Sequence, residues 1–188
     1  MVCIDAANWN QYLSLNSIRI DWKEFRSLLE DMFAKVELHF YWGTITKNWY
    51  RHNRSEATGR QPTDESFLEA KVKREGFFKK LKDLGYTVRS KPISQIYVGN
   101  NQYEYKCNFD VEIAIDVMQN LDGFDILVLC SGDGDFIALI RKLKQLCKET
   151  HVIAPEDRFN SDLKKATNSY DYLNDLLYWV KDLGQKKP

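Results

Sequence analysis

Residues 127–136 read LVLCSGDGDF, and the fold follows from this stretch. The apolar run at 127–130 is typical of a buried strand in a parallel sheet, and it ends in a turn of small residues that carries Asp133 and Asp135. A helical pattern follows, because apolar side chains recur every three or four positions: Phe136, Leu139, Ile140, Leu143, Leu146 and Cys147. Carboxylates at the carboxyl end of a central strand lie where open α/β sheets bind their ligands.

The start of the chain shows a similar arrangement. Residues 1–4 predict a short strand, and Asp5 and Asn8 follow it. Asp110 lies at the start of a helix predicted over 109–121, which is apolar on most sides and is therefore expected to be buried. Three separate segments would thus deliver acids to one sheet edge. Hard oxygen ligands in this number are typical of Mg²⁺ or Mn²⁺, which would support phosphodiester hydrolysis.

Strands and helices alternate along the rest of the chain, which predicts an α/β fold: a three-layer sandwich with a central, mainly parallel sheet. The predicted strands are 1–4, 36–42, 86–89, 125–130 and 151–154. The predicted helices are one that Asp21 caps, one that Pro62-Thr63-Asp64 opens and Gly85 ends, 109–121, one from Phe136, and a last one through Leu173 and Val180. We expect one domain over residues 1–183 and a frayed tail at 184–188.

Composition narrows the class of protein. The chain has 188 residues, 44% of them apolar, and no formal net charge, which is ordinary for a globular domain. It has neither a signal segment nor a run approaching the roughly 18 apolar residues of a membrane span, so a cytoplasmic protein without membrane contact is expected. The four cysteines form no closely spaced pair, which argues against a zinc site.

Each acidic residue also has a purely structural interpretation. Asp135 would serve as the N-cap of the following helix, and Asp133 would suit an ordinary Gly-Asp-Gly turn. Asp5 would be an exposed aspartate at a strand end, and Asp110 would cap its helix. Taken singly, the acids are weak indications. Their arrival at one edge from three segments is what favours a metal site.

Three motifs make the prediction more specific. Residues 131–136, SGDGDF, resemble the S-G-D-x-D-F signature of the NYN family, the LabA-like branch of the PIN-like nucleases. Residues 4–8, IDAAN, resemble its I-D-x-x-N motif. Residues 106–118, KCNFDVEIAIDVM, are similar to the family block that ends D-V-x-x-A-x-D. The motifs stand in the family's order and span nearly the whole chain.

This resemblance implies a five-stranded parallel sheet and a Mg²⁺- or Mn²⁺-dependent ribonuclease. It implies that Asp5, Asp110 and Asp133 are the principal metal ligands and that Asp135 completes the acidic pocket. Asn8 would orient a water or ligand, and Ser131 lies beside the acids as a supporting residue. The alternative is a non-catalytic RNA-binding or regulatory module on the same fold. The enzyme is favoured because no motif acid is lost.

Residues 44–61 are predicted to form a long polar loop. Its cations and aromatic side chains alternate, as in surfaces that bind RNA phosphates and stack on bases: Lys47, Trp49, Arg51 and Arg54. The alternative is a solvated loop whose Trp49 folds back on the core. Residues 92–105 predict an excursion with a turn at 99–101, and its tyrosines are expected to pair across a hairpin.

Aromatic side chains leave homodimerisation open. Five of them are expected at the surface, where they would permit a dimer interface without requiring one: Trp9, Tyr12, Trp49, Tyr178 and Trp179.

Overall fold

The computed structural model describes residues 1–100 and 102–181. The chain divides into two compact units, of which the first comprises Met1–Tyr41 with Phe109–Pro188 and the second comprises Trp42–Asn108. The tail expected at 184–188 lies outside the described residues. The two units are described in turn.

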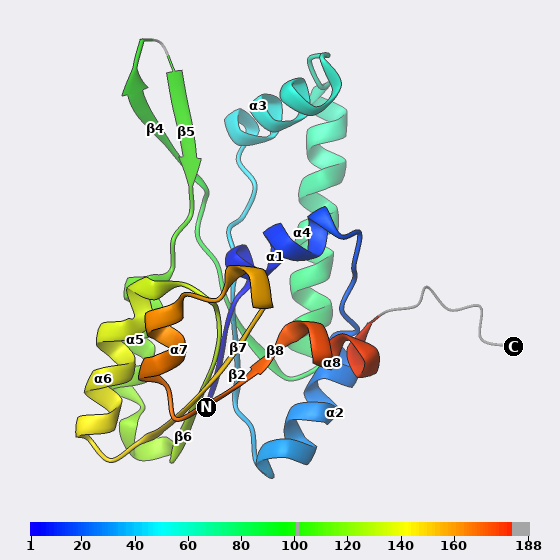
Figure 1. Cartoon of the computed structure of the whole chain (residues 1–188). Coiled ribbons are helices and arrows are strands. Elements are labelled where there is room, and N and C mark those ends of the chain that lie inside the picture. Colours follow the sequence, from blue (N-terminus) through cyan, green and yellow to red (C-terminus); the bar gives the residue numbers. More distant parts are fainter. Residues whose placement is uncertain (101, 182–188) are drawn as a thin grey trace, which may run out of the picture. The chain divides into compact units, whose positions relative to one another are not determined.

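Five strands of the first unit are hydrogen-bonded side by side in the order β2-β1-β6-β7-β8, and each neighbouring pair is parallel (Figure 1). They are β1 (Val2–Asp5), β2 (Leu38–Tyr41), β6 (Ile126–Cys130), β7 (Glu149–Ala154) and β8 (Ser169–Tyr172). Every side chain of β1 and β2 is buried, as expected of strands covered on both faces. The predicted α/β fold with a mainly parallel sheet is confirmed, although β8 had not been predicted.

Helices cover this sheet on both sides. They are α1 (Ala6–Leu15), α2 (Trp22–Phe33), α5 (Asp110–Gln119), α6 (Ile137–Gln145), α7 (Ser161–Ala166) and α8 (Leu173–Val180). The helices α6 and α7 pack together on one side, and α2 and α8 pack together on the other (Figure 1). This is the expected three-layer arrangement. Three short 3₁₀ turns lie between these elements: η1 (Leu121–Gly123), η2 (Gly134–Phe136) and η3 (Glu156–Arg158).

An aromatic cluster forms part of the core of the first unit. Trp9 is 1% exposed, and its ring meets Phe25 edge-on at 5.5 Å between centroids. Its indole Nε1 donates to the carbonyl of Ile153 in β7 at 3.2 Å, so its polar atom is satisfied inside the protein. The assignment of Trp9 and Tyr12 to a surface aromatic patch is therefore wrong, because both are buried on α1.

The described residues of the second unit, 42–100 and 102–108, form two helices and three strands. They are α3 (Lys47–Thr58), α4 (Asp64–Asp83), β3 (Tyr86–Arg89), β4 (Ser94–Gly99) and β5 (Gln102–Lys106). The strands β4 and β5 form an antiparallel hairpin, in which Tyr97 faces Tyr103 with the ring centroids 5.4 Å apart. The expected pairing of tyrosines across a hairpin is confirmed.

The prediction of a polar loop at 44–61 is wrong, because α3 occupies most of it. Thr46 caps the helix through its hydroxyl oxygen, which accepts from the Trp49 N–H at 3.4 Å. Gly59 ends it in the left-handed conformation, with φ of 67°. Tyr50 is buried and packs against Phe67 of α4, with the two ring centroids 5.8 Å apart. Apart from Tyr50, Trp49 and Ala57 the helix is polar, so its sequence shows no strong helical period.

Burial of α5 was also overestimated. Ile113 and Val117 are fully buried, but Val111 is 68% and Ile115 48% exposed. The helix therefore has one buried face.

Within the described ranges, no helix combines the length and the apolar character that crossing a bilayer requires.

Candidate functional site

The centre of the site is the paired ends of β1 and β6. These strands are parallel neighbours, with Ile4 opposite Cys130, so Asp5 and Ser131 leave the sheet side by side. The Ser131 hydroxyl donates to Oδ2 of Asp5 at 3.1 Å, and the backbone N–H of Asn8 donates to Oδ1 of the same carboxylate at 3.4 Å. Asp5 thus caps α1 and anchors the loop after β6.

Asn8 of α1 forms a second connection to the loop after β6. Its Oδ1 accepts from the backbone N–H of Gly132 at 3.1 Å. The amide oxygen therefore holds the loop after β6, and the expected role of Asn8 toward a water or ligand stays a prediction. Its place beside Asp5 agrees with the spacing of the IDAAN motif.

The loop at 131–136 is braced from within. The Ser131 hydroxyl oxygen accepts from the Asp133 N–H at 3.3 Å, and Oδ1 of Asp133 accepts from the Asp135 N–H at 3.0 Å. Asp133 therefore does cap a turn, namely η2. Asp135 does not cap α6, since Phe136 stands at that N-cap without a side-chain hydrogen bond. Turn geometry leaves the carboxylate of Asp135 exposed.

A second segment holds this loop from outside and was not foreseen. The backbone N–H of Asn160 donates to the Gly132 carbonyl at 3.0 Å. A Cβ on Gly132 would lie 2.1 Å from the carbonyl oxygen of Arg158, and one on Gly134 would lie 2.5 Å from the Asn160 amide nitrogen. Close approach of the backbone thus requires glycine at 132, whereas at 134 the side chain of Asn160 would have to move. Asn160 also caps α7, and its place before Ser161 was the available sequence signal.

Three acids converge beside this loop. Each of Asp110, Asp133 and Asp135 offers a carboxylate oxygen that lies within 4.8 Å of those of the other two. Asp110 is the first residue of α5, whose N-cap is Phe109, so Asp110 is not itself the cap. Asp110 and Asp133 are half-buried and Asp135 is exposed. The arrangement offers hard oxygen donors at one end of the sheet.

Asp5 lies behind this group and is not one of its three members. It is 7% exposed, which contradicts the interpretation as an exposed strand-end residue. Its pKa is raised to about 6, mainly by burial and also by the negative charges of Asp110 and Asp133. The hydrogen bonds from Asn8 and Ser131 act in the opposite direction. Asp5 is therefore electrostatically coupled to the acidic cluster.

The predicted RNA-binding side chains lie on α3 in the second unit. Lys47 donates to Oδ2 of Asp64 at 2.6 Å, and Arg51 donates to Oδ1 of the same carboxylate at 3.0 Å. The guanidinium of Arg54 lies 6.0 Å from the centre of the Tyr50 ring. Trp49 is half-buried, between the two interpretations given to it. Two cations thus share one carboxylate.

A cavity of about 410 Å³ opens beside α3, within the second unit. His52 of α3 and Tyr105 of β5 meet there with ring centroids 4.9 Å apart, and Asn48 donates to Gln95 at 2.8 Å. Arg51 also lines the cavity. Its lining is polar and aromatic, as in surfaces that bind single-stranded nucleic acid.

The chain is similar to known proteins in both sequence and structure. The family model described as NYN domain matches residues 1–174. The chain is 35% identical over 117 residues to the low amplitude and bright protein LabA of Synechococcus elongatus, a match that covers 60% of this chain and 62% of LabA, less than two thirds of that protein. A solved structure from Vibrio parahaemolyticus, the protein of unknown function VPA0982, has a TM-score of 0.66 at 20% identity, over 95% of this chain and 93% of that one. At this identity the likeness shows the fold alone.

Proposed function

Because the chain belongs to the NYN domain family, we propose that it is a metal-dependent ribonuclease, which hydrolyses RNA phosphodiesters at the cluster of Asp110, Asp133 and Asp135. The observation that carries this proposal is the convergence of three carboxylates within 4.8 Å of one another. Two elements, α5 and the loop after β6, supply them. Like charges at this distance repel, and a bound divalent cation would offset that repulsion.

The donor set fits Mg²⁺ or Mn²⁺. Asp110, Asp133 and Asp135 supply only oxygen atoms, which hard divalent cations prefer, and no cysteine or histidine belongs to this group. When bound, such an ion would activate water and stabilise the charge that develops on the phosphate. The nearby negative charge that raises the pKa of Asp5 would be offset by the cation.

The remaining motif residues would act by positioning. Asp5 accepts hydrogen bonds from Ser131 and from the backbone of Asn8, and Asn8 accepts one from Gly132. These bonds fix the end of β1 against the loop that carries Asp133. We therefore assign Asp5 to the acidic pocket, with Asn8 and Ser131 as the side chains that hold it in place.

RNA binding is assigned to α3 of the second unit. Lys47, Arg51 and Arg54 supply three cations along one helix, and Trp49 retains part of its ring surface. Cations would contact phosphates, and an aromatic ring would stack on a base. The shared pairing of Lys47 and Arg51 with Asp64 would lower their effective charge in the absence of RNA.

The test is cleavage of a panel of labelled RNAs in Mn²⁺, in Mg²⁺ and in EDTA, for the wild-type protein and Asp133→Asn. We expect cleavage only with a divalent ion. The cleavage rate of Asp133→Asn should be at least 100-fold lower, which is on the order of the effect of removing one group that stabilises a transition state. Asp122→Asn, which removes an exposed carboxylate of the same unit, is the matched control.

Circular dichroism establishes that both variants are folded. Cleavage by Asp133→Asn at the wild-type rate would refute the assignment of the site. RNA binding without cleavage in any metal, from folded protein, would instead identify a non-catalytic RNA-binding or regulatory module on this fold.

A further inference from the structure

Three aromatic rings gather where β8 and the segment after η3 meet in the first unit. Phe159 meets Tyr170 edge-on at 5.6 Å and Tyr172 at 6.4 Å between centroids. Tyr170 and Tyr172 are themselves 5.6 Å apart. These rings and Lys164 of α7 are called the β8 aromatic cluster below. Neither the family motifs nor the proposed active site uses any of its four members.

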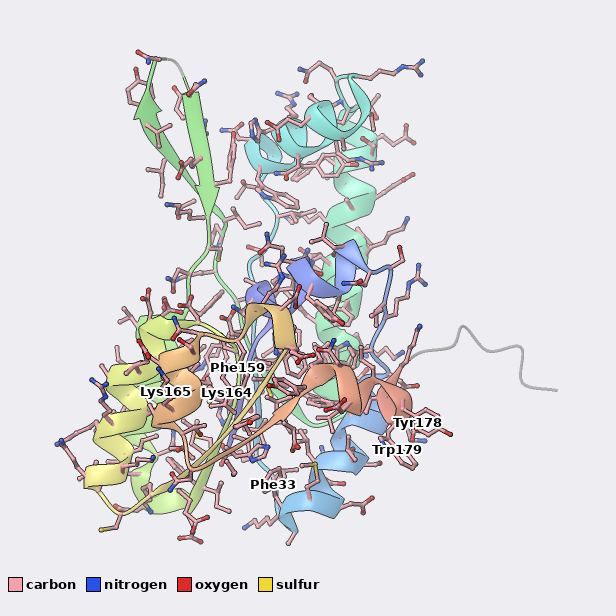
Figure 2. All side chains as sticks on the ribbon, in the orientation of Figure 1. Phe33, Phe159, Lys164, Lys165, Tyr178 and Trp179 are labelled. Carbon is pink, nitrogen blue, oxygen red and sulfur yellow. The ribbon has the colours of Figure 1, made fainter. Side chains whose placement is uncertain are left out.

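A cation lies within the cluster. The Lys164 ammonium is 4.5 Å from the centre of the Tyr170 ring and 4.7 Å from that of Tyr172. It also donates a hydrogen bond to the Tyr172 hydroxyl, and this bond raises the pKa of Lys164. The ammonium is therefore charged at neutral pH and is held against two aromatic faces. Phe159 and Lys164 lie close together in Figure 2.

The cluster is accessible and directly joined to the active-site loop. Tyr170 is 40% exposed, and Phe159, Lys164 and Tyr172 are half-buried. The residue after Phe159 is Asn160, whose N–H donates to the carbonyl of Gly132. Phe159 is thus the direct chain neighbour of Asn160, the residue that holds the loop of Asp133 and Asp135.

Protection of the sheet edge does not account for this composition. β8 is the last strand of the sheet, and a lysine or another charge is enough to prevent pairing with a further chain. Three rings and a central ammonium go beyond that requirement. Ring surfaces interleaved with a cation are instead the composition that binds single-stranded nucleic acid, with bases on the rings and phosphates at the cation.

We propose that the β8 aromatic cluster binds the substrate strand as single-stranded RNA beside the acidic pocket. The inference rests on the proposed ribonuclease function and specifies its substrate class. Bases stack on Tyr170 and on the accessible surface of Phe159, and Lys164 contacts a phosphate. A duplex is excluded from this mode, because its bases are stacked on one another and unavailable to the rings.

The test measures binding of labelled oligouridylate to the intact protein in EDTA, so that cleavage does not interfere. The comparison ligands are an abasic strand of equal length and an RNA duplex. We expect Tyr170→Leu to weaken oligouridylate binding about tenfold and to abolish the preference over the abasic strand. Tyr170→Phe keeps the ring and should bind as the wild type does. Lys164→Met should reduce the salt slope of log K by about 0.7.

Matched controls lie elsewhere in the same unit. Tyr178 and Trp179 of α8 form a more exposed aromatic pair, 85% and 66% exposed, and they lie apart from Phe159 and Lys164 (Figure 2). Their double substitution by Leu should leave binding unchanged. Lys142→Met, on α6, removes one exposed ammonium outside the cluster.

The outcomes separate the two proposals. Unchanged binding by Tyr170→Leu, or equal affinity of the wild type for duplex and single strand, would overturn this inference even if metal-dependent cleavage is observed. Absence of both RNA binding and cleavage in the wild-type protein would overturn the proposed function and this inference together.

Discussion

The Tyr41 hydroxyl donates to Oδ2 of Asp116 across 2.9 Å. Both residues are buried, at 0% and 7% exposed. Tyr41 is the last residue of β2 and lies opposite Asp5 in the sheet register, whereas Asp116 is on α5, the helix that begins with Asp110. The bond therefore joins the strand beside Asp5 to the helix that supplies an acid of the cluster.

Tyr41→Phe should lower the free energy of unfolding by about 1–3 kcal/mol, because the variant removes a hydrogen bond from a buried carboxylate. Urea denaturation measures the effect. Tyr178→Phe is the control, since that tyrosine is 85% exposed and its substitution should change stability by less than about 0.5 kcal/mol. Equal stability of Tyr41→Phe and the wild type would mean that the bond makes no net contribution.

Much of the sheet could be predicted from the sequence. The strands β1, β2, β6 and β7 are short apolar runs with polar or small residues at their ends, and all four were expected close to their observed bounds. The strand β8 was missed because it is an edge strand and its sequence, SYDY, contains no apolar run. Propensity and period carry little signal for such a segment, and its pairing with β7 is a tertiary effect.

The helices that were missed have a similar cause. α1 follows Asp5 without any intervening loop, and α3 is polar apart from Tyr50 and Trp49. The N-cap residues were readable, as Asp5 for α1 and Thr46 for α3. The buried stripe of α1, Trp9, Tyr12 and Leu13, is short, and α3 buries only Tyr50. The third missed helix, α7, has only six residues.

The candidate site was predictable to the level of residue types and segments. The grouping of Asp110 with Asp133 and Asp135 was implied by the family motifs, since Asp110 begins a helix and does not end a strand. The burial of Asp5 and the support from Asn160 did not follow, because each depends on a partner far along the chain. Asp5 bonds to Ser131, and Asn160 bonds to Gly132.

Asp5 should make the metal-free protein less stable as pH rises. Its pKa is about 6 in the folded state and about 3.9 in an unfolded chain, so the folded protein binds this proton more tightly between those values. The protonated Asp5 therefore contributes its full stabilisation of the folded state below pH about 4, and this contribution is lost by pH about 6. Asp5→Asn cannot titrate and should be more stable than the wild type at pH 7, by at most about 3 kcal/mol.

The measurement is urea denaturation in EDTA at pH 4, 5, 6 and 7. The exposed Asp31→Asn is the control for loss of one carboxylate. A stability difference between Asp5→Asn and the wild type that does not grow with pH would contradict the raised pKa. Addition of Mn²⁺ should stabilise the wild-type protein selectively, since the cation favours the charged carboxylate.

Gly132→Ala should be more damaging than Gly134→Ala. The new Cβ at Gly132 would meet a backbone carbonyl, that of Arg158, whereas the one at Gly134 would meet the side chain of Asn160, which has more freedom to move. We expect a loss of about 1–3 kcal/mol for Gly132→Ala. Thermal unfolding ranks the variants. Gly123→Ala, where the added methyl meets open space, is the control, and a larger loss there than at Gly132 would contradict the argument.

Asp64→Asn should strengthen RNA binding several-fold if α3 contacts phosphates. The carboxylate pairs with Lys47 and Arg51, and its hydrogen bond from Lys47 lowers its pKa, so it is charged and competes with RNA for both cations.

Conversely, replacing Lys47, Arg51 and Arg54 by alanine should weaken RNA binding and reduce the slope of log K against log salt concentration by about 2. Titration of labelled single-stranded RNA at several salt concentrations measures both effects. Asp83→Asn is the control, because that carboxylate pairs with Lys79 of α4 and should not affect binding. An unchanged affinity in Asp64→Asn together with an unchanged slope in the triple variant would show that α3 is a solvated helix with no part in RNA recognition.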